Sequence, residues 1–391
     1  MKVVITLEQR FIRTPDGRIW TQGQFPYSFY LQYLKVFKKV SVIARVLDVE
    51  RLPSGMIQAN GKNVSFIPLP CYIGPLRFLL NFWKIRRIIK KSVNKEDAFI
   101  LRISSNIASQ LESILRKRGY PYGVEFVGDP DLGFSPGTMK HLLRPLFRWI
   151  FIRHAKRQSE NAVAVSYVTQ EYLQRKYPCP NYSIGVSDVQ LTKEDFILEP
   201  RIYLPFFSSL KIVNVGSFEQ LYKGQDVLID ALDLCIKNGL DIYLYLVGDG
   251  KNRKLMERKV QDLQLQDRVI FLGQLADVKE VQEVLDQCDL FVLPSRAEAL
   301  PRSIIEAMAR GLPCIGTNIG GIPELISPEF LVPPNDARAL ALKIEETLYS
   351  PLKTSKASEE NLEKAKEFTN EVLLEKRIEF YKSIKNSTVL I

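Results

Sequence analysis

Two glutamates on either side of a predicted helix start are the residues of this sequence best suited to chemistry. Glu298 and Glu306 are separated by seven residues, and the apolar run Leu290–Leu293 before them is typical of a buried parallel strand. The stretch Ser303–Ala309 predicts a helix, which a glycine and a proline stop. Glu298 is therefore expected in a loop at the carboxyl end of a strand, where open α/β sheets bind ligands. A helix start suits a phosphate, and carboxylates beside it can accept hydrogen bonds from sugar hydroxyls. The spacing fits a nucleotide sugar, with Glu298 for the hexose and Glu306 for the ribose.

A second candidate element combines a strand, a glycine turn and a cation. The run Lys211–Val215 predicts a strand, Gly216 permits a close approach of the backbone to a ligand, and Lys223 can reach a diphosphate. A leaving nucleoside diphosphate gains negative charge as the glycosidic bond breaks. A cation and helix N–H groups aimed at it stabilise the transition state more than the ground state.

Together these elements resemble the family 4 retaining glycosyltransferases, which have the GT-B fold. The resemblance rests on the E-x7-E motif, in which Ala299 replaces the usual glycine, and on its flanking sequences Pro294-Ser295, Ala307-Met308-Ala309-Arg310-Gly311 and Gly320-Gly321-Ile322-Pro323-Glu324. It is nearly continuous from residue 211 to residue 325.

The resemblance implies a set of donor-binding residues in the second half of the chain. These are Gly216, Ser217, Lys223, Gly250, Arg253, Gly273, Leu300, Pro301, Arg302, Ser303 and Glu306. Lys223 matches a donor-phosphate ligand of the family, and Glu298 and Lys223 are the expected catalytic residues. Ser217 stands where many members carry a second phosphate-binding arginine. Arg302 could replace that arginine or be an ordinary surface residue.

Both halves of the chain alternate short apolar strands with helical stretches, which predicts an α/β protein with parallel sheets. The expected GT-B architecture has two Rossmann-like, doubly wound parallel-sheet domains that face a cleft. We predict an acceptor-binding domain over residues 1–190, a linker over 191–208 and a nucleotide-sugar-binding domain over 209–370. The resemblance implies that the helix expected over 371–391 crosses back to the first domain.

Composition narrows the class of protein. The 391 residues are 46% hydrophobic and 25% charged, as in a globular protein, and no apolar run reaches bilayer length. Residues 1–7 predict a strand rather than a signal peptide. Five scattered cysteines indicate reduced thiols and a cytoplasmic protein, and two histidines argue against a hydrolase triad or a metal centre. We therefore expect no metal and no cofactor beyond the donor substrate.

The net charge of +10 is unevenly distributed. Residues 1–200 hold 30 Lys and Arg against 16 Asp and Glu, which gives +14, whereas the remaining 24 and 28 give −4. The segment 77–91 is a basic amphipathic helix pattern with Phe78, Phe82, Ile85 and Ile89 on one face, and 141–157 repeats the theme. Such helices can bind an anionic membrane surface, or their apolar face can pack on the sheet. We predict a peripheral membrane protein, and no nucleic-acid-binding motif is present.

Two acceptor-side candidates lie in the first half. Asp129 follows the predicted strand Tyr122–Val127, where it could bind or deprotonate an acceptor hydroxyl, although a loop or helix-capping aspartate is the alternative. Gly23 could match the acceptor-side glycine of the family. The Asp129-Pro130-Asp131 triplet resembles a metal motif of another fold, but no other residue supports a metal there.

These observations predict a retaining hexosyltransferase that uses a UDP- or GDP-linked sugar and a glycan acceptor, expected to be lipid-linked in surface polysaccharide synthesis. One alternative is a nucleotide-sugar epimerase or hydrolase of the same fold. Another is a peripheral membrane protein that only binds nucleotides.

Overall fold

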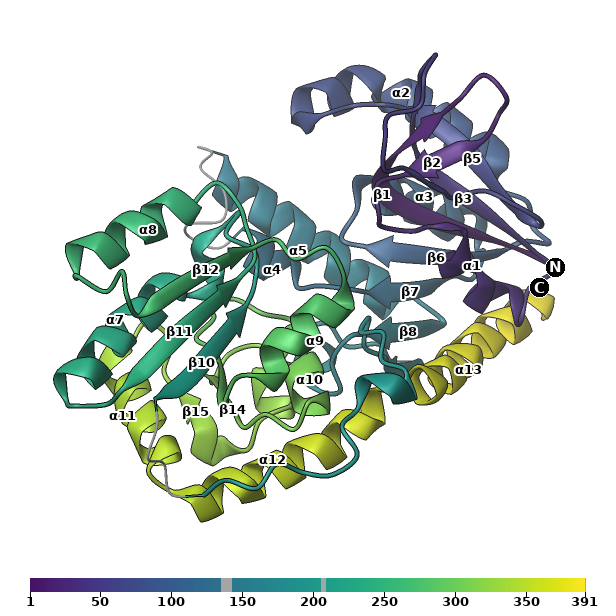
Figure 1. Cartoon of the computed structure of the whole chain (residues 1–391). Helices are drawn as coiled ribbons and strands as arrows, with labels where there is room; N and C mark the ends of the chain where they lie inside the picture. The colour runs from purple at the N-terminus through teal and green to yellow at the C-terminus, as the bar shows by residue number, and fades with distance from the viewer. Residues whose placement is uncertain (135–142, 205–208, 391) are drawn as a thin grey trace. The chain divides into compact units, whose positions relative to one another are not determined.

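The computed structural model describes residues 1–134, 143–204 and 209–390. Contacts along the backbone divide the chain into two compact units (Figure 1). Unit 1 comprises Met1–Pro130, Trp149–Val186 and Leu374–Ile391, and unit 2 comprises Asp131–Arg148 and Ser187–Leu373. His141, the start of the second basic segment predicted from the sequence, lies outside the described residues.

Unit 1 is built on a sheet whose parallel strands run in the order β5-β3-β1-β6-β7-β8-β9, with β2 and β4 added antiparallel beside β1. The strands are β1 (Lys2–Arg13), β2 (Ile19–Thr21), β3 (Lys39–Asp48), β4 (Ile57–Gln58), β5 (Val64–Pro70), β6 (Ala98–Ile103), β7 (Gly123–Phe126), β8 (Ala164–Tyr167) and β9 (Tyr182–Gly185). The strand expected over residues 3–7 is longer, because a register shift between Thr6 and Arg10 lets β1 continue to pair with β3.

The helices of the first half are α1 (Tyr27–Leu34), α2 (Gly74–Ser92), α3 (Asn106–Arg118), α4 (Pro130–Gly133), α5 (Arg144–Glu160) and α6 (Tyr172–Lys176). The C-terminal helix α13 (Asn370–Val389) also reaches this unit. Its residues Phe380, Tyr381 and Ile384 lie in the core of unit 1, where the Tyr381 ring stacks on Tyr33 with centroids 4.8 Å apart. A side chain on Gly123 would collide with Ile384, so β7 and α13 pack at close range.

Unit 2 contains a wholly parallel sheet in the order β12-β11-β10-β13-β14-β15. Its strands are β10 (Leu210–Val215), β11 (Ile242–Val247), β12 (Val269–Gly273), β13 (Leu290–Leu293), β14 (Cys314–Thr317) and β15 (Leu331–Val332). Its helices are α7 (Gln225–Lys237), α8 (Arg253–Asp262), α9 (Val278–Asp286), α10 (Arg302–Ala309), α11 (Ala337–Leu348) and α12 (Pro351–Ala365). The doubly wound parallel sheets predicted from the sequence are confirmed.

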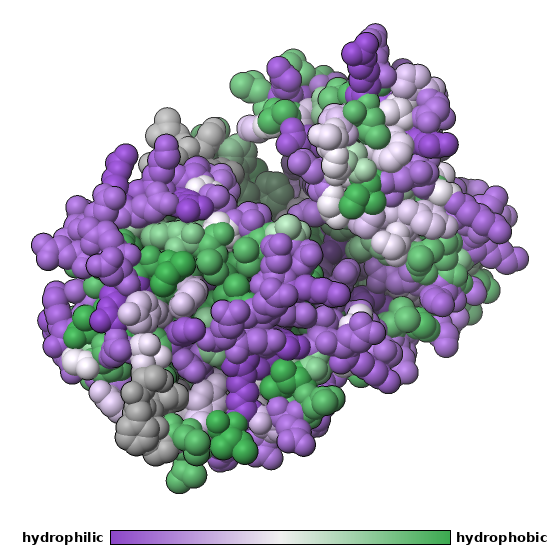
Figure 2. All heavy atoms as spheres, in the orientation of Figure 1, coloured by the Kyte–Doolittle hydropathy of each residue, from purple (hydrophilic) through white to green (hydrophobic). Residues whose placement is uncertain are grey.

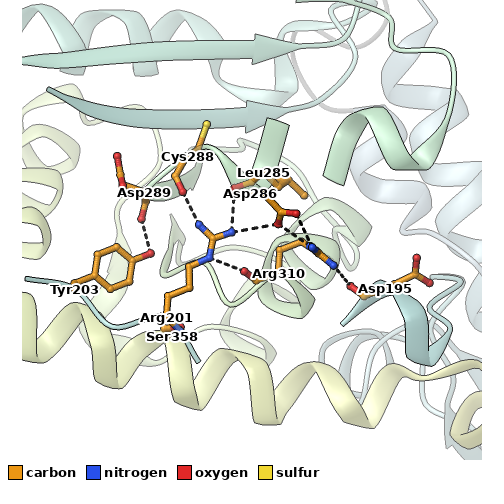
Figure 3. A network of polar contacts seen from close by, with 9 residues as sticks. All are labelled: Asp195, Arg201, Tyr203, Leu285, Asp286, Cys288, Asp289, Arg310 and Ser358. Carbon is orange, nitrogen blue, oxygen red and sulfur yellow. Dashed lines mark hydrogen bonds and ion pairs between the residues drawn. The ribbon is translucent and has the colours of Figure 1, made fainter. Parts of the chain in front are cut away.

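The described part of the predicted linker is hydrogen-bonded to the rest of unit 2. Residues 205–208 of this linker are not described. The Arg201 guanidinium donates hydrogen bonds to the carbonyl oxygens of Arg310, Cys288 and Leu285 at 2.8, 2.7 and 3.1 Å (Figure 3). The Tyr203 hydroxyl donates to the Asp289 carbonyl at 3.0 Å. These bonds hold residues 201–203 against the ends of α9 and α10.

Helix α2 has the apolar face predicted from the sequence, and it also exposes apolar side chains that the pattern did not indicate. Ile85 and Ile89 are fully buried, and the ring of Phe78 packs against Tyr72 at 5.3 Å, so the predicted apolar face contacts protein. A different set of large apolar side chains is exposed, namely Leu76 (75%), Leu79 (64%), Leu80 (84%) and Trp83 (77%). Figure 2 shows hydrophobic side chains at the surface over α2. Within the described residues, no helix is both long and apolar enough to cross a bilayer.

Candidate functional site

The candidate donor residues gather where the strand order of unit 2 reverses. β10 pairs with β11 on one side and with β13 on the other, although β11 and β12 separate β10 from β13 in sequence. Loops that leave such neighbouring strands in opposite directions open a crevice at their carboxyl ends. The loop after β10 carries Gly216 and Ser217, and the loop after β13 carries Glu298.

At this point the two predicted catalytic side chains contact each other. Lys223, in a short 3-10 turn over Leu221–Lys223, lies with its Nζ 2.5 Å from Glu298 Oε1. The Lys223 and Glu298 side chains are only 13% and 10% exposed. Ser295 donates a second hydrogen bond to the same carboxylate oxygen at 3.1 Å. Burial lowers the pKa of Lys223, but the Glu298 carboxylate and the nearby Tyr222 outweigh it, so the net shift of the pKa is upward and the lysine stays charged.

Glycines allow the loops around this ion pair to touch through their backbones. Gly224 has a φ of +74°, and a Cβ there would lie 2.0 Å from the Pro294 carbonyl oxygen. Gly320 has a φ of +57°, and a Cβ there would lie 1.7 Å from the Glu298 carbonyl oxygen. No larger residue fits either position. The packing of the backbone therefore requires both glycines, whether or not a ligand binds.

Helix α10 begins directly after this loop. Its N-cap is Pro301, and no side chain caps its first turn, so the free N–H groups of a helix start are available to an anion. Arg302, in that turn, is exposed, and among the described residues its guanidinium makes no hydrogen bond or ion pair. Ser303 is half-buried and lies beside it, while Leu300 and Pro301 form the preceding loop.

Glu306 lies one turn further along α10 and is half-buried. Its carboxylate has no hydrogen-bond partner within the described part of the chain. Burial raises the pKa of Glu306, and the charges of Arg302 and Lys223 only partly oppose that shift. A partly desolvated carboxylate without a protein partner can accept hydrogen bonds from a ligand hydroxyl.

The remaining donor candidates form a neighbouring cluster. The Ser217 hydroxyl accepts a hydrogen bond from the Glu219 N–H at 3.1 Å and lies by the turn that contains Gly250. The Arg253 guanidinium lies over the Phe271 ring at 5.8 Å and pairs with Glu257 at 2.8 Å.

Gly273, at the end of β12, has a φ of +73°, and a Cβ there would lie 3.2 Å from Arg253. The fold thus brings together the ends of β10, β11 and β12, and Gly216 at the end of β10 lies against the Lys223 side chain.

The acceptor-side candidates are arranged differently. Asp129 is fully buried, and its carboxylate accepts hydrogen bonds from Tyr172, Lys176 and Tyr177 at 2.7, 2.7 and 2.6 Å. Both of its oxygens are therefore occupied by protein donors, as suits a packing role. Gly23 lies in an exposed turn after β2 with a φ of +81° and has no neighbour within 4 Å of a built Cβ.

Among the described residues, no three His, Cys, Asp or Glu side chains lie close enough together to hold a metal ion. The prediction that no metal is needed remains a prediction.

Sequence reasoning missed three residues that support the site. Ser295 bonds Glu298, and Arg296 pairs with Asp226 through two hydrogen bonds of 2.7 Å. The available signal was Arg296, which closely follows the apolar strand Leu290–Leu293, since an arginine beside a buried strand needs an acceptor.

Comparison with known proteins gives consistent results. Residues 206–368 match the model of the family described as glycosyl transferases group 1. The chain is 29% identical to Protein CapJ of Staphylococcus aureus over 330 residues, which cover 83% of this chain and 81% of CapJ. It is 32% identical to the amylovoran biosynthesis glycosyltransferase AmsK of Erwinia amylovora over 172 residues, 42% of this chain and 41% of AmsK.

Among solved structures, the chain resembles Anabaena Alr3699/HepE in complex with UDP and glucose. The TM-score is 0.64 at 17% sequence identity, and the match covers 97% of this chain and 98% of the other. At this level of identity the similarity is one of fold.

Proposed function

Because residues 206–368 belong to the glycosyl transferases group 1 family and the chain has the GT-B fold its sequence predicted, we propose that this glycosyltransferase is a retaining hexosyltransferase. Its donor is a UDP- or GDP-linked hexose, and its acceptor is a hydroxyl of a lipid-linked glycan in surface polysaccharide synthesis. The observation that carries the proposal is the Lys223–Glu298 pair beside the uncapped start of α10.

The residues of unit 2 support specific roles. The start of α10 and Lys223 bind the donor diphosphate, and Arg302 supplies the second cation that Ser217 cannot. A lysine ammonium has three N–H donors, so Lys223 can bind a phosphate oxygen while it retains Glu298. Glu298 contacts the hexose, and Glu306 accepts hydrogen bonds from the ribose.

In the proposed reaction the bond between the anomeric carbon and the phosphate oxygen breaks on the face where the acceptor oxygen attacks. The acceptor hydroxyl transfers its proton to the leaving diphosphate, and configuration is retained. Lys223 and the α10 N–H groups stabilise the charge that develops on the diphosphate. No carboxylate is assigned as a covalent nucleophile.

A donor screen tests this proposal. The full chain is incubated with UDP- and GDP-hexoses, and thermal stabilisation and release of the nucleoside diphosphate are measured. AmsK is named as an amylovoran biosynthesis glycosyltransferase, and HepE was solved with UDP and glucose. UDP-hexoses and polyprenyl-diphosphate glycans are therefore the first substrates to test. Conversion of a UDP-sugar to its epimer without acceptor would favour the epimerase alternative, and nucleotide binding without turnover would favour the binding protein.

Access to a lipid-linked acceptor is supported by α2. Leu76, Leu79, Leu80 and Trp83 recur at the spacing of one helix face, and cationic residues flank them. Burial of four such side chains contributes on the order of 1.5–3 kcal/mol each, and each nearby cation adds about 1 kcal/mol at an anionic surface.

Flotation with anionic vesicles tests this docking. Serine at Leu79, Leu80 and Trp83 should abolish flotation, and serine at Arg86, Arg87, Lys90 and Lys91 should remove its salt-sensitive part. Nucleotide binding should survive both changes. If the wild type fails to float at low salt, α2 does not dock on membranes and a water-soluble acceptor is favoured.

A further inference from the structure

A half-buried arginine, Arg296, joins the two loops that carry the Lys223–Glu298 pair. The Arg296 guanidinium donates to both oxygens of Asp226 at 2.7 Å and to the Leu221 carbonyl oxygen at 2.6 Å. Its Nε also donates to the side chain of Asn335. The backbone N–H of Arg296 donates to the Tyr222 carbonyl oxygen at 2.6 Å. We call these contacts the Arg296 clamp.

The clamp lies very close to the site along the chain. Lys223 stands between Leu221 and Asp226, both of which the guanidinium binds, and Glu298 follows Arg296 by two residues. Few rotatable bonds therefore separate the clamp from either member of the ion pair. The Arg296 and Asp226 side chains are 27% and 26% exposed, so solvent competes weakly for these bonds.

A two-pronged arginine–carboxylate pair fixes orientation as well as distance, because the guanidinium and the carboxylate are both planar. We propose that Arg296 and Asp226 are positioning residues that set the Lys223 ammonium at the phosphate-binding point of the donor site. This inference rests on the proposed function, since it assigns Lys223 to the donor diphosphate. Neither residue needs to touch the donor.

The chain offers a matched control at the other end of α10. Arg310 donates to both oxygens of Asp286 at 2.8 and 2.5 Å and to the Asp195 carbonyl oxygen at 3.0 Å (Figure 3). This pair has the same chemistry, and its arginine and aspartate side chains are 14% and 40% exposed. An eight-residue helix, about 12 Å long, separates it from the start of α10, so it should stabilise the fold without setting Lys223.

Titration calorimetry with UDP and GDP tests the clamp on the full chain. Asp226→Asn should weaken nucleotide binding about tenfold or more, and Asp286→Asn should change it less than about twofold at a similar loss of thermal stability. In a Lys223→Ala background, Asp226→Asn should have almost no further effect, because coupled residues are not additive. Arg296→Lys, which keeps the charge but loses the two-pronged geometry, should reproduce Asp226→Asn and provides the test if that variant does not fold.

The outcomes separate the two proposals. A wild-type chain that binds neither UDP nor GDP overturns the proposed function, and the clamp assignment falls with it. Nucleotide binding by the wild type that Asp226→Asn and Arg296→Lys leave intact overturns the positioning role alone. The same holds if Asp226→Asn costs as much affinity without Lys223 as with it.

Discussion

Replacement of Lys223 by alanine removes the ammonium group that lies against Glu298. The two side chains are almost fully buried and their charged atoms lie 2.5 Å apart. Unit charges near a protein surface attract by about 4 kcal/mol at 4 Å, and a diphosphate bound at the α10 start would attract Lys223 on the same scale. Loss of one such preorganised group typically removes about 2.7–4 kcal/mol of transition-state stabilisation, so turnover should fall by about 10²–10³.

The same substitution has a stability cost that must be separated from catalysis. In Lys223→Ala the Ser295 hydroxyl is the one donor among the described residues that the Glu298 carboxylate keeps. A buried polar group that loses its partner costs about 1–3 kcal/mol, and more when it is charged. The double variant Lys223→Ala/Glu298→Gln replaces the stranded charge by a neutral amide. It should recover most of the lost thermal stability while remaining inactive.

The assay measures acceptor-dependent release of nucleoside diphosphate, with thermal unfolding measured on the same samples. Lys223→Ala that unfolds within a few degrees of the wild type and turns over within tenfold of it would refute the phosphate role. A double variant that regains activity with its stability would show that the lysine serves folding only.

Three further predictions concern the carboxylates. Glu306→Gln should chiefly weaken nucleotide binding and Glu298→Gln should chiefly lower turnover, so unchanged UDP and GDP affinity in the first variant would contradict the ribose assignment. Because burial raises the pKa of Glu306, this acid takes up its proton at a higher pH than an ordinary glutamate, and calorimetry should show nucleotide affinity falling as the pH is lowered through that range. Glu306→Gln should lose this part of the pH dependence and keep only the part that comes from the nucleotide phosphates. Asp129→Asn should lower the thermal midpoint because it weakens the bonds to Lys176 and two tyrosines, whereas lost turnover at unchanged stability would restore its predicted catalytic role.

Some features of the site follow from local sequence. The strand Leu290–Leu293, the loop with Glu298 and the helix with Glu306 are contiguous, so apolar runs and helix stop signals were enough to predict their order. The free N–H groups of α10 are a consequence of helix geometry alone. The doubly wound class followed in the same way from the alternation of strands and helices.

Other features depended on tertiary structure. Lys223 and Glu298 are 75 residues apart, and they meet only because β13 pairs with β10 although two strands intervene in the chain. The Arg296 clamp bridges 70 residues for the same reason. By sequence position Asp129 could have been a carboxylate that faces a cleft, and only the tertiary structure shows that its side chain accepts hydrogen bonds from Tyr172, Lys176 and Tyr177.

The face that α2 exposes also required the structure. The sequence pattern placed Ile85 and Ile89 on an apolar face, which is correct, but it could not say that this face packs on protein while Leu80 and Trp83 remain uncovered. Helical periodicity fixes which residues share a face, because it is set by 3.6 residues per turn. Which face meets solvent is set by the neighbours a helix docks against, and those neighbours come from distant parts of the chain.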